Sequence, residues 1–289
     1  MKVLITGSSG FLGEALSTKL TKLGHTVIPY DLSDGYDICD KEQFKKVAEE
    51  SKATTVIHLA AIADLYLFHN NPTLSNKVNI EGTRNILQVC EQLKLRLLFA
   101  STCCCYGNSP HHPVDETIPL QPTEPYALSK QKSEEDILAV GLPHCCMRLA
   151  TFYGPKMRRA LVIGTFMDQI HHDYPIYIDG DGKQTRTYTY IDDVVNGIIT
   201  IATTDPKYTI INVTTEEETS VLDVVDQVES VTKKNAIIEW REDRSYQIMR
   251  EEISNKRLRE LGWKQNYTFQ EGVKETYEWY LKNGVKFDC

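Results

Sequence analysis

A tyrosine and a lysine four residues apart, Tyr126 and Lys130, are the side chains in this sequence best suited to proton chemistry. On a helix, this spacing places both on one face. A free tyrosine has a pKa near ~10, but a neighbouring ammonium group favours its phenolate. Such a phenolate can take the proton of an alcohol while a hydride leaves the same carbon. Thr102, expected at the end of a preceding strand, can hydrogen-bond the same oxygen and stabilise the developing charge.

The spacing is common on ordinary helices, so it gains meaning only if the chain also holds a hydride acceptor. Residues 3–5 form an unbroken apolar run, typical of a central parallel strand, and glycines follow at Gly7, Gly10 and Gly13. They permit, in turn, a tight turn, close approach to a pyrophosphate, and packing of helix on strand. A helix that begins near Phe11 points its amide groups at the phosphates. The amino terminus is therefore predicted to bind a dinucleotide.

Asp31 indicates which dinucleotide. It lies at the end of a predicted strand over residues 26–30, 18 positions after Gly13. This is close to the ~20 expected of a carboxylate that binds a ribose 2′-hydroxyl. A carboxylate there repels a 2′-phosphate, which favours NAD over NADP. The alternative is an aspartate that only caps its own loop.

These residues require a sheet that brings strand ends to one edge. Strands and helices alternate over residues 1–150, which predicts an α/β fold with a doubly wound parallel sheet, a Rossmann domain that binds NAD. The expected strands end in small or polar residues, and cover 26–30, 55–61, 96–100 and 145–150. The expected helices cover 11–23, 41–51, 72–93 and a segment that begins at 126. His58, inside one of these strands, is interpreted as a satisfied core residue.

Past residue 150 the pattern changes. We expect residues 151–289 to form a smaller C-terminal α/β substrate-binding domain, interleaved with the last strands of the sheet. Residues 173–190 are predicted to be turn-rich, and helices are expected over 192–202, 220–231 and 269–282.

Composition excludes several other classes. The net charge is −8 with no long basic block, which argues against nucleic acid. No apolar run has the ~18–20 residues of a membrane helix, and no leader precedes the first strand. The eight cysteines include a run of three and a pair, which suits neither a disulfide framework nor a metal site. We therefore expect reduced thiols, no metal, no membrane and a cytoplasmic protein.

Together these motifs resemble the extended short-chain dehydrogenase/reductases, specifically the NAD-dependent epimerase/dehydratases of nucleotide sugars. The resemblance implies NAD as cofactor, a nucleotide-sugar substrate and a homodimer formed through a four-helix interface. The implied cofactor-binding residues are Gly7, Gly10, Phe11, Leu12, Asp31, Asp37, Ile38, Leu59, Ala60, Ala61, Asn79, Tyr126 and Lys130. The implied catalytic residues are Tyr126, Lys130, Thr102 and Cys104. The implied substrate-binding residues are Thr102, Cys103, Tyr126, Thr151, Arg186 and Arg244, with Arg241 an alternative to the last.

The pair that follows Thr102 distinguishes the reactions within this resemblance. The sugar 4,6-dehydratases carry two acids there, whereas this chain has Cys103 and Cys104. The sequence therefore predicts a UDP-sugar 4-epimerase-like enzyme, which oxidises C4 transiently and reduces it again. One alternative is a 3,5-epimerase or dehydratase-type reaction with Cys104 as base and Lys156, Arg158 or Arg159 as acid. Another is a non-catalytic NAD-binding regulator.

Overall fold

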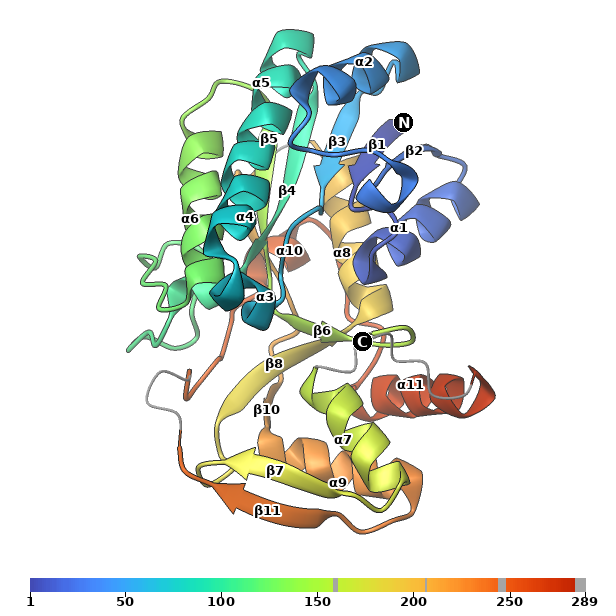
Figure 1. Cartoon of the computed structure of the whole chain (residues 1–289), viewed down its shortest axis with the longest axis vertical. Helices are drawn as coiled ribbons and strands as arrows, with labels where there is room; N and C mark the ends of the chain where they lie inside the picture. Colours follow the sequence, from blue (N-terminus) through green and yellow to red (C-terminus); the bar gives the residue numbers. More distant parts are fainter. Residues whose placement is uncertain (158–160, 206, 244–247, 284–289) are drawn as a thin grey trace.

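The computed structural model describes residues 1–157, 161–205, 207–243 and 248–283. Its main sheet has six parallel strands and holds the amino-terminal half together (Figure 1). In spatial order they are β2 (Thr26–Tyr30), β1 (Lys2–Thr6), β3 (Thr55–His58), β4 (Arg96–Thr102), β5 (His144–Leu149) and β9 (Ile210–Val213). The order reverses beside β1, as in a doubly wound sheet, which confirms the predicted Rossmann fold.

Helices cover both faces of this sheet because each strand is apolar on both sides. Val3 and Ile5 pack in one core with α1 and α8, whereas Leu4 packs in a second core with α2 and α5. The helices of this half are α1 (Phe11–Lys22), α2 (Lys41–Ser51), α3 (Leu65–Asn70), α4 (Pro72–Asn76), α5 (Thr83–Leu93), α6 (Pro125–Leu138) and α8 (Ile191–Thr203). Short helical turns are η1 (Leu32–Asp34), the π-helix η2 (Lys77–Gly82) and η3 (Cys103–Tyr106).

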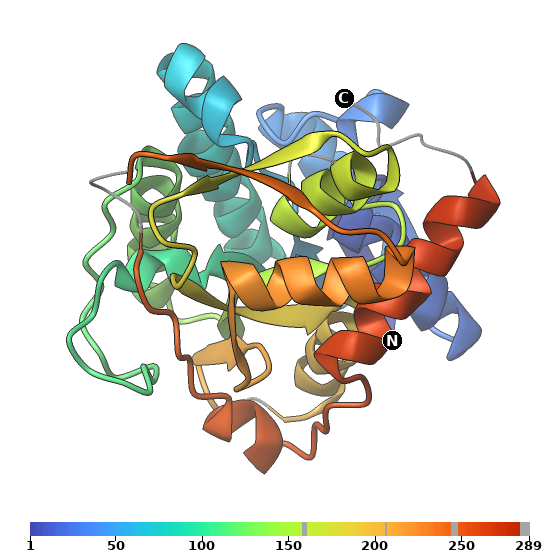
Figure 2. The same cartoon turned by 90° about the horizontal axis from the view of Figure 1, so that it is seen from below.

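The remaining elements form a smaller unit below the carboxyl ends of the sheet strands (Figures 1 and 2). Its strands are β6 (Thr151–Tyr153), β8 (Thr185–Tyr190) and β10 (Glu218–Ser220) in one sheet, and β7 (Pro175–Asp179) with β11 (Ile237–Arg241) in another. Its helices are α7 (Val162–His171), α9 (Val221–Thr232) and α11 (Phe269–Asn283). Within this unit α7 packs against β7 and α9, and α11 packs against α9 (Figure 2). The short helix α10 (Lys256–Glu260) belongs to neither group and contacts β9 of the main sheet.

Two segments differ from expectation. Residues 173–190 were expected to be turn-rich, but only the centre turns, and β7 and β8 flank it. The physical reason is an alternation inside β7, where Ile176 and Ile178 are buried and Tyr177 is exposed. The helix α7 was not expected at all, although Ile163, Phe166, Met167 and Ile170 form its buried face at helical spacing.

The sheet interleaves the two halves of the chain, because β9 comes from the second half yet pairs with β5. The ends of β4 and β5 and the residues that follow them line one cavity at the edge of the main sheet. Across the described ranges, no helix is both long and apolar enough to cross a membrane.

Candidate functional site

The turn between β1 and α1 fits closely against the end of β3. Gly7 has a left-handed φ of 72°, and a Cβ there would lie 2.7 Å from the backbone nitrogen of Ala60. A Cβ on Gly13 would lie 2.0 Å from the carbonyl oxygen of Gly7. Real Cβ atoms do not approach so closely, so both positions require glycine. The turn therefore leaves its backbone open at the amino-terminal end of α1, where an anion is favoured.

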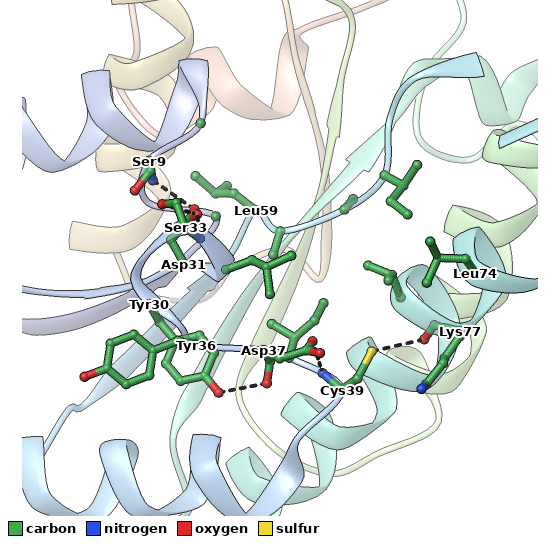
Figure 3. Close-up of a pocket in the computed structure, with 18 residues that line it drawn as sticks. Ser9, Tyr30, Asp31, Ser33, Tyr36, Asp37, Cys39, Leu59, Leu74 and Lys77 are labelled. Atoms are coloured by element: carbon green, nitrogen blue, oxygen red, sulfur yellow. Dashed lines mark hydrogen bonds between the residues drawn. The ribbon is translucent and has the colours of Figure 1, made fainter. Parts of the chain in front are cut away.

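A cavity of about 550 Å³ opens beside this turn (Figure 3). The predicted cofactor residues that line it are Gly7, Gly10, Asp31, Asp37, Ile38, Leu59, Ala60 and Ala61. The turn that follows β2 is braced from within, since the Asp37 carboxylate accepts from the Cys39 N–H at 2.8 Å and Tyr30 donates to the Asp37 carbonyl at 2.9 Å. The wall is largely apolar, with carboxylates at one side, which suits a nucleoside.

Asp31 holds two loops together and also lines the cavity. Its carboxylate accepts from the backbone N–H of Ser9 at 3.0 Å and from that of Ser33 at 3.0 Å. It thus fastens the glycine turn to the loop after β2. It also lines the cavity, as Figure 3 shows, so its negative charge faces any ligand held there.

A second cavity of about 430 Å³ continues along the same edge of the sheet. It shares Gly7, Gly10, Leu59 and Ala61 with the first, so the two form one trough. Its lining also includes the predicted residues Phe11, Leu12, Thr102, Cys104, Tyr126, Lys130 and Thr151. The aromatic ring of Phe11 stacks on that of Phe152 at 5.7 Å and closes one side. A trough of this length and lining fits an extended dinucleotide with a small substrate beyond it.

Lys130 is held beneath this second cavity. It is 3% exposed, and its Nζ donates to the Ala100 carbonyl at 2.7 Å. The same Nζ lies 4.7 Å from the ring centre of Phe99 and 5.9 Å from that of Tyr126. Burial lowers the pKa of Lys130 to about 8. A cation fixed beside a phenol favours its phenolate, so the predicted role of the pair fits this geometry.

Tyr126 is positioned from two sides. It follows Pro125, the first residue of α6, where a proline is compatible with the start of a helix. Its ring meets that of Phe68 edge-on at a centroid distance of 6.4 Å. Phe68 belongs to α3 and is 2% exposed. Sequence reasoning missed Phe68, because nothing in the α3 segment itself indicates that it meets α6.

Thr102 and Cys104 occupy the turn after β4. The Thr102 Oγ1 accepts from the Cys104 N–H at 3.2 Å, which caps η3 and fixes the turn. Burial, and next the carboxylate of Glu251, raise the pKa of the Cys104 thiol. A raised pKa keeps the sulfur protonated, which opposes a role as thiolate base.

The residues considered as the acid partner of Cys104 do not support its role as a base. Lys156 forms an ion pair with Glu14 on α1, and it lines a different cavity from Cys104. Arg158 and Arg159 lie outside the described residues.

Three predicted contacts have other partners in the structure. The Cys103 thiol is buried and donates to the Arg148 carbonyl at 3.3 Å, which departs from the expected substrate contact. The Asn79 side chain pairs with both backbone groups of Ile62, at 2.8 and 3.0 Å. Since Ile62 lines the first cavity, Asn79 shapes that cavity through this loop.

The Arg186 Nη1 donates to the carbonyls of Thr185 and Ile248, at 2.7 and 2.6 Å.

Two further residues considered from the sequence, His58 and Arg241, lie apart from the trough. His58 is fully buried and hydrogen-bonds Thr6 at 2.6 Å and Thr83 at 2.9 Å, so its interpretation as a satisfied core residue is confirmed. Arg241 stacks on the Tyr177 ring at 3.6 Å, on the β7–β11 pair. Arg244 lies outside the described residues.

A buried network ties the catalytic helix to the sheet. Glu134, one turn after Lys130, pairs with Arg148 of β5 at 2.7 Å, and both side chains are almost fully buried. Arg148 also donates to the Tyr106 hydroxyl at 2.9 Å, which in turn donates to Asn212 of β9 at 2.7 Å. These four residues come from four separate elements, so the sequence offered no signal for the network.

Comparison with known proteins agrees with this geometry. A model of the NAD dependent epimerase/dehydratase family matches residues 3–214. The chain belongs to this family. A UDP-glucuronate 4-epimerase from Thermodesulfobacterium geofontis is 31% identical, and the match covers 97% of this chain and 96% of that protein. A dTDP-D-glucose 4,6-dehydratase from Mus musculus is 28% identical, over 98% of this chain and 89% of that protein.

A solved structure extends the likeness to the fold. The UDP-glucose 4-epimerase of Thermus thermophilus, in complex with NAD, superposes with a TM-score of 0.90 at 28% identity. The superposition covers 99% of this chain and 100% of that one. The family and these relatives are NAD-dependent enzymes of nucleotide-sugar metabolism, and they include both epimerases and a dehydratase.

Proposed function

We propose that this family member is a UDP-sugar 4-epimerase that uses NAD. The observation that carries the proposal is the pairing of Tyr126 with buried Lys130, beside Thr102, in a cavity whose other wall is the glycine turn. This places a base and a dinucleotide cradle in one trough. The presence of an intact pair also argues against a non-catalytic NAD-binding regulator, which has no need of it.

The chain's own residues perform the proton chemistry. The Tyr126 phenolate takes the proton of the sugar C4 hydroxyl, and later returns it to the same oxygen. Lys130 stabilises the phenolate while that proton is away, and the Thr102 hydroxyl steadies the charge on the substrate oxygen. When bound, NAD supplies the hydride acceptor and donor at C4.

The lining residues divide between the two ligands. Gly7, Gly10, Phe11 and Leu12 hold the pyrophosphate region, while Asp31, Asp37 and Ile38 hold the adenosine. Leu59, Ala60 and Ala61 form the floor between them, with Asn79 behind Ile62. Thr151, which lines the second cavity, contacts the substrate together with Arg186.

The turn after β4 supports 4-epimerisation over the reactions that need a base beyond Tyr126. A 4,6-dehydratase requires an acid beside Thr102, and this chain has a buried Cys103 and a protonated Cys104 there. The same protonated thiol weakens 3,5-epimerisation through Cys104. The mouse relative is a dehydratase by name, so the distinction rests on these two cysteines rather than on overall similarity.

A homodimer accompanies this proposal. The helices α5 and α6 lie side by side on one face of the sheet (Figure 1), linked by an Arg84–Asp136 ion pair at 2.7 Å. Leu128 and Leu138 on α6 are exposed, so a second copy of this helix pair would bury them in a four-helix interface. Analytical ultracentrifugation tests this, and a purely monomeric mass at micromolar concentration would contradict it.

We also propose that the protein is cytoplasmic. The described cysteines are all free, which suits a reducing compartment. Fractionation of the native cells, with immunoblotting of each fraction, tests this location.

One assay tests the catalytic proposal. NAD-loaded protein is mixed with UDP-glucose in heavy water, and the sugar is followed by NMR. We expect UDP-galactose to appear with no deuterium at any sugar carbon, because the hydride returns to the carbon it left. Deuterium at C3 or C5 would instead support proton abstraction by Cys104. Absence of any C4-inverted product across UDP-sugars would overturn the proposal.

A further inference from the structure

Two stacked aromatic rings separate the reaction cavity from a hollow on the outer surface. The reaction cavity is the one that contains Tyr126 and Thr102. The rings of Phe11 and Phe152 lie 5.7 Å apart between centroids, with 19° between their planes. Phe11 lines both the reaction cavity and an outer hollow of about 300 Å³, whereas Phe152 lines the reaction cavity alone of these two. The pair therefore forms a partition between them.

The outer hollow lies between α1 and the segment that follows β6. Its lining carries five charged side chains, namely Glu14, Lys19, Lys22, Lys156 and Asp192. Glu14 and Lys156 form an ion pair there, and both side chains are half exposed. Such groups hold water, so the partition stands between that water and the reacting groups.

The position of Phe152 in this partition is set by the residues after it. Successive side chains of a strand point to opposite sides, and Tyr153 points into the core. Tyr153 is 1% exposed and donates its hydroxyl to the Phe269 carbonyl of α11 at 3.0 Å. At Gly154 the chain turns closely onto α8, since a Cβ there would lie 2.5 Å from the Ile191 Cγ2. The ring of Phe152 is thus turned towards α1 and the trough.

Phe152 also lies where the two sides of the trough meet. It directly follows Thr151, and both line the reaction cavity together with Tyr126. Its stacking partner Phe11 directly follows Gly10 of the glycine turn and is the first residue of α1. The ring of Phe152 therefore borders the space in which the sugar is oxidised beside the dinucleotide.

The proposed reaction makes a particular demand on this border. The C4–H hydride goes to the dinucleotide and the O–H proton goes to Tyr126, which leaves a ketone at C4. Inversion requires the hydride to return to the opposite face of C4, so the ketone must turn over inside the cavity. A sugar that turns cannot be held by fixed hydrogen bonds to its ring, so the cavity walls must confine it. An apolar ring such as that of Phe152 confines without binding.

On the basis of the proposed function, we propose that Phe152 retains the C4 ketone in the cavity between the two hydride transfers. A ketone that leaves has lost a hydride to the dinucleotide and a proton to Tyr126. The dinucleotide then stays reduced and cannot begin another cycle with a fresh sugar. Retention by the partition thus determines how many cycles one bound dinucleotide supports.

The test counts escaped ketone per molecule of C4-inverted product. NAD-loaded protein turns over UDP-glucose, and the fluorescence of the reduced dinucleotide is followed. The filtrate is treated with sodium borodeuteride, which marks any free ketone with deuterium at C4. Phe152→Ala is expected to raise both signals per product molecule by about tenfold, because the stacked wall is lost. Phe152→Tyr keeps the ring and should behave as the wild type does.

Two further variants support this comparison. Lys156→Gln changes a residue of the same segment that faces the outer hollow, and it should leave the escape of ketone unchanged. Phe152→Leu keeps apolar volume without a ring, and an increase of about threefold is expected from it. It serves as the test if Phe152→Ala does not fold.

A second measurement needs no sugar. Cys104 lines the reaction cavity, so its alkylation by iodoacetamide reports access to that cavity. In the NAD-loaded protein, peptide mass mapping should show alkylation about threefold faster in Phe152→Ala than in the wild type. The buried thiol of Cys103 supplies an internal reference whose rate should not change. An unchanged rate at Cys104 would contradict the partition.

The outcomes separate this inference from the proposed function. Equal escape of ketone from the wild type and the Phe152 variants, with C4-inverted product from each, would overturn the inference and leave the epimerase proposal intact. Slower epimerisation in Phe152→Ala without escaped ketone would show a structural role only, and would also overturn it. No C4-inverted product from the wild type would overturn the proposed function, and the inference with it.

Discussion

The cofactor side of the trough and its sugar side differ in how the chain builds them. On the cofactor side, Gly7, Gly10 and Asp31 come from one strand–turn–helix unit and the strand that follows it. On the sugar side, Thr102, Tyr126 and Thr151 line one cavity although they come from three separate elements, β4, α6 and β6. The cofactor side therefore depends on local geometry, whereas the sugar side depends on how the whole chain folds.

This difference suits the two tasks. The cofactor is the same in every turnover and across relatives, so one rigid turn against the end of β3 can serve it. The sugar wall is built from residues of several elements that lie away from the glycine turn, so one of them can change without disturbing that turn. We therefore expect substitutions on the cofactor side to change whether the enzyme works, and those on the sugar side to change what it accepts.

The largest effect is expected at the junction of the two sides. Tyr126→Phe removes the phenol that accepts the C4 proton, and kcat should fall by about 10³-fold. The dissociation constant for NAD, measured by calorimetry, should change little. Tyr174→Phe, an exposed tyrosine on the smaller unit, is the matched control. Full activity of the Tyr126 variant would remove the basis of the whole mechanism.

A large loss of stability is expected when the buried Glu134–Arg148 pair, which joins α6 to β5, is broken. Glu134→Gln leaves Arg148 buried beside a neutral partner, which should cost about 3–5 kcal/mol in the free energy of unfolding. The exposed neighbour Glu135, paired with Lys132 at 3.1 Å, supplies the control, since Glu135→Gln should cost less than about 1 kcal/mol. Urea denaturation measures both, and equal losses would show that the network does not anchor α6.

The same contrast explains which parts the sequence could predict. The glycine turn, Asp31 and the Tyr126–Lys130 pair are short-range patterns whose spacing alone implies their geometry. Strand and helix order over the first half also followed from periodicity, because buried parallel strands have a clear apolar signature. The Rossmann fold and the family were predictable for this reason.

The sugar side was not predictable in the same way. Phe152 lies in a three-residue strand, and nothing near it in sequence indicates that its ring meets Phe11 at the start of α1. Cys103 and Cys104 are adjacent, yet one thiol faces Arg148 and the other faces the cavity, a distinction made by the 3₁₀ turn η3. Such facts depend on contacts between distant segments, and local patterns do not contain them.

Lys130 offers a smaller and pH-dependent test of the cofactor side. Its pKa is about 8 in the folded protein and ~10.4 when unfolded. Between these values the unfolded chain binds more protons at this site, so the contribution of Lys130 to stability should increase as the pH rises from about 8 to about 10. The raised pKa values of buried thiols such as Cys90, Cys105 and Cys145 act in the opposite direction, so this contribution is the difference between the wild type and Lys130→Met. The full effect is about 3 kcal/mol. Urea titrations at several pH values measure it in the protein without ligand.

The variant Lys130→Met should lack this increase, and Lys132→Met, exposed on the same helix, should retain it. If the free energy of unfolding changed with pH in the same way in the wild type and in Lys130→Met, burial would not lower the pKa of Lys130. The cofactor side would then be less preorganised than its geometry indicates.

The smallest effect concerns the choice of dinucleotide, and it tests whether one local residue suffices for it. The two carboxylate oxygens of Asp31 accept separately from the N–H groups of Ser9 and Ser33, so Asp31→Asn keeps an acceptor for only one of them, and it removes the charge beside the cavity. The preference for NAD over NADP should therefore fall by about tenfold, or about 1.4 kcal/mol, as measured by calorimetry with each dinucleotide. Asp34→Asn, on the exposed turn η1, should leave the preference unchanged. An unchanged ratio for Asp31→Asn would mean that Asp31 serves only to fasten the turn, and that even the cofactor side depends on residues beyond its own motif.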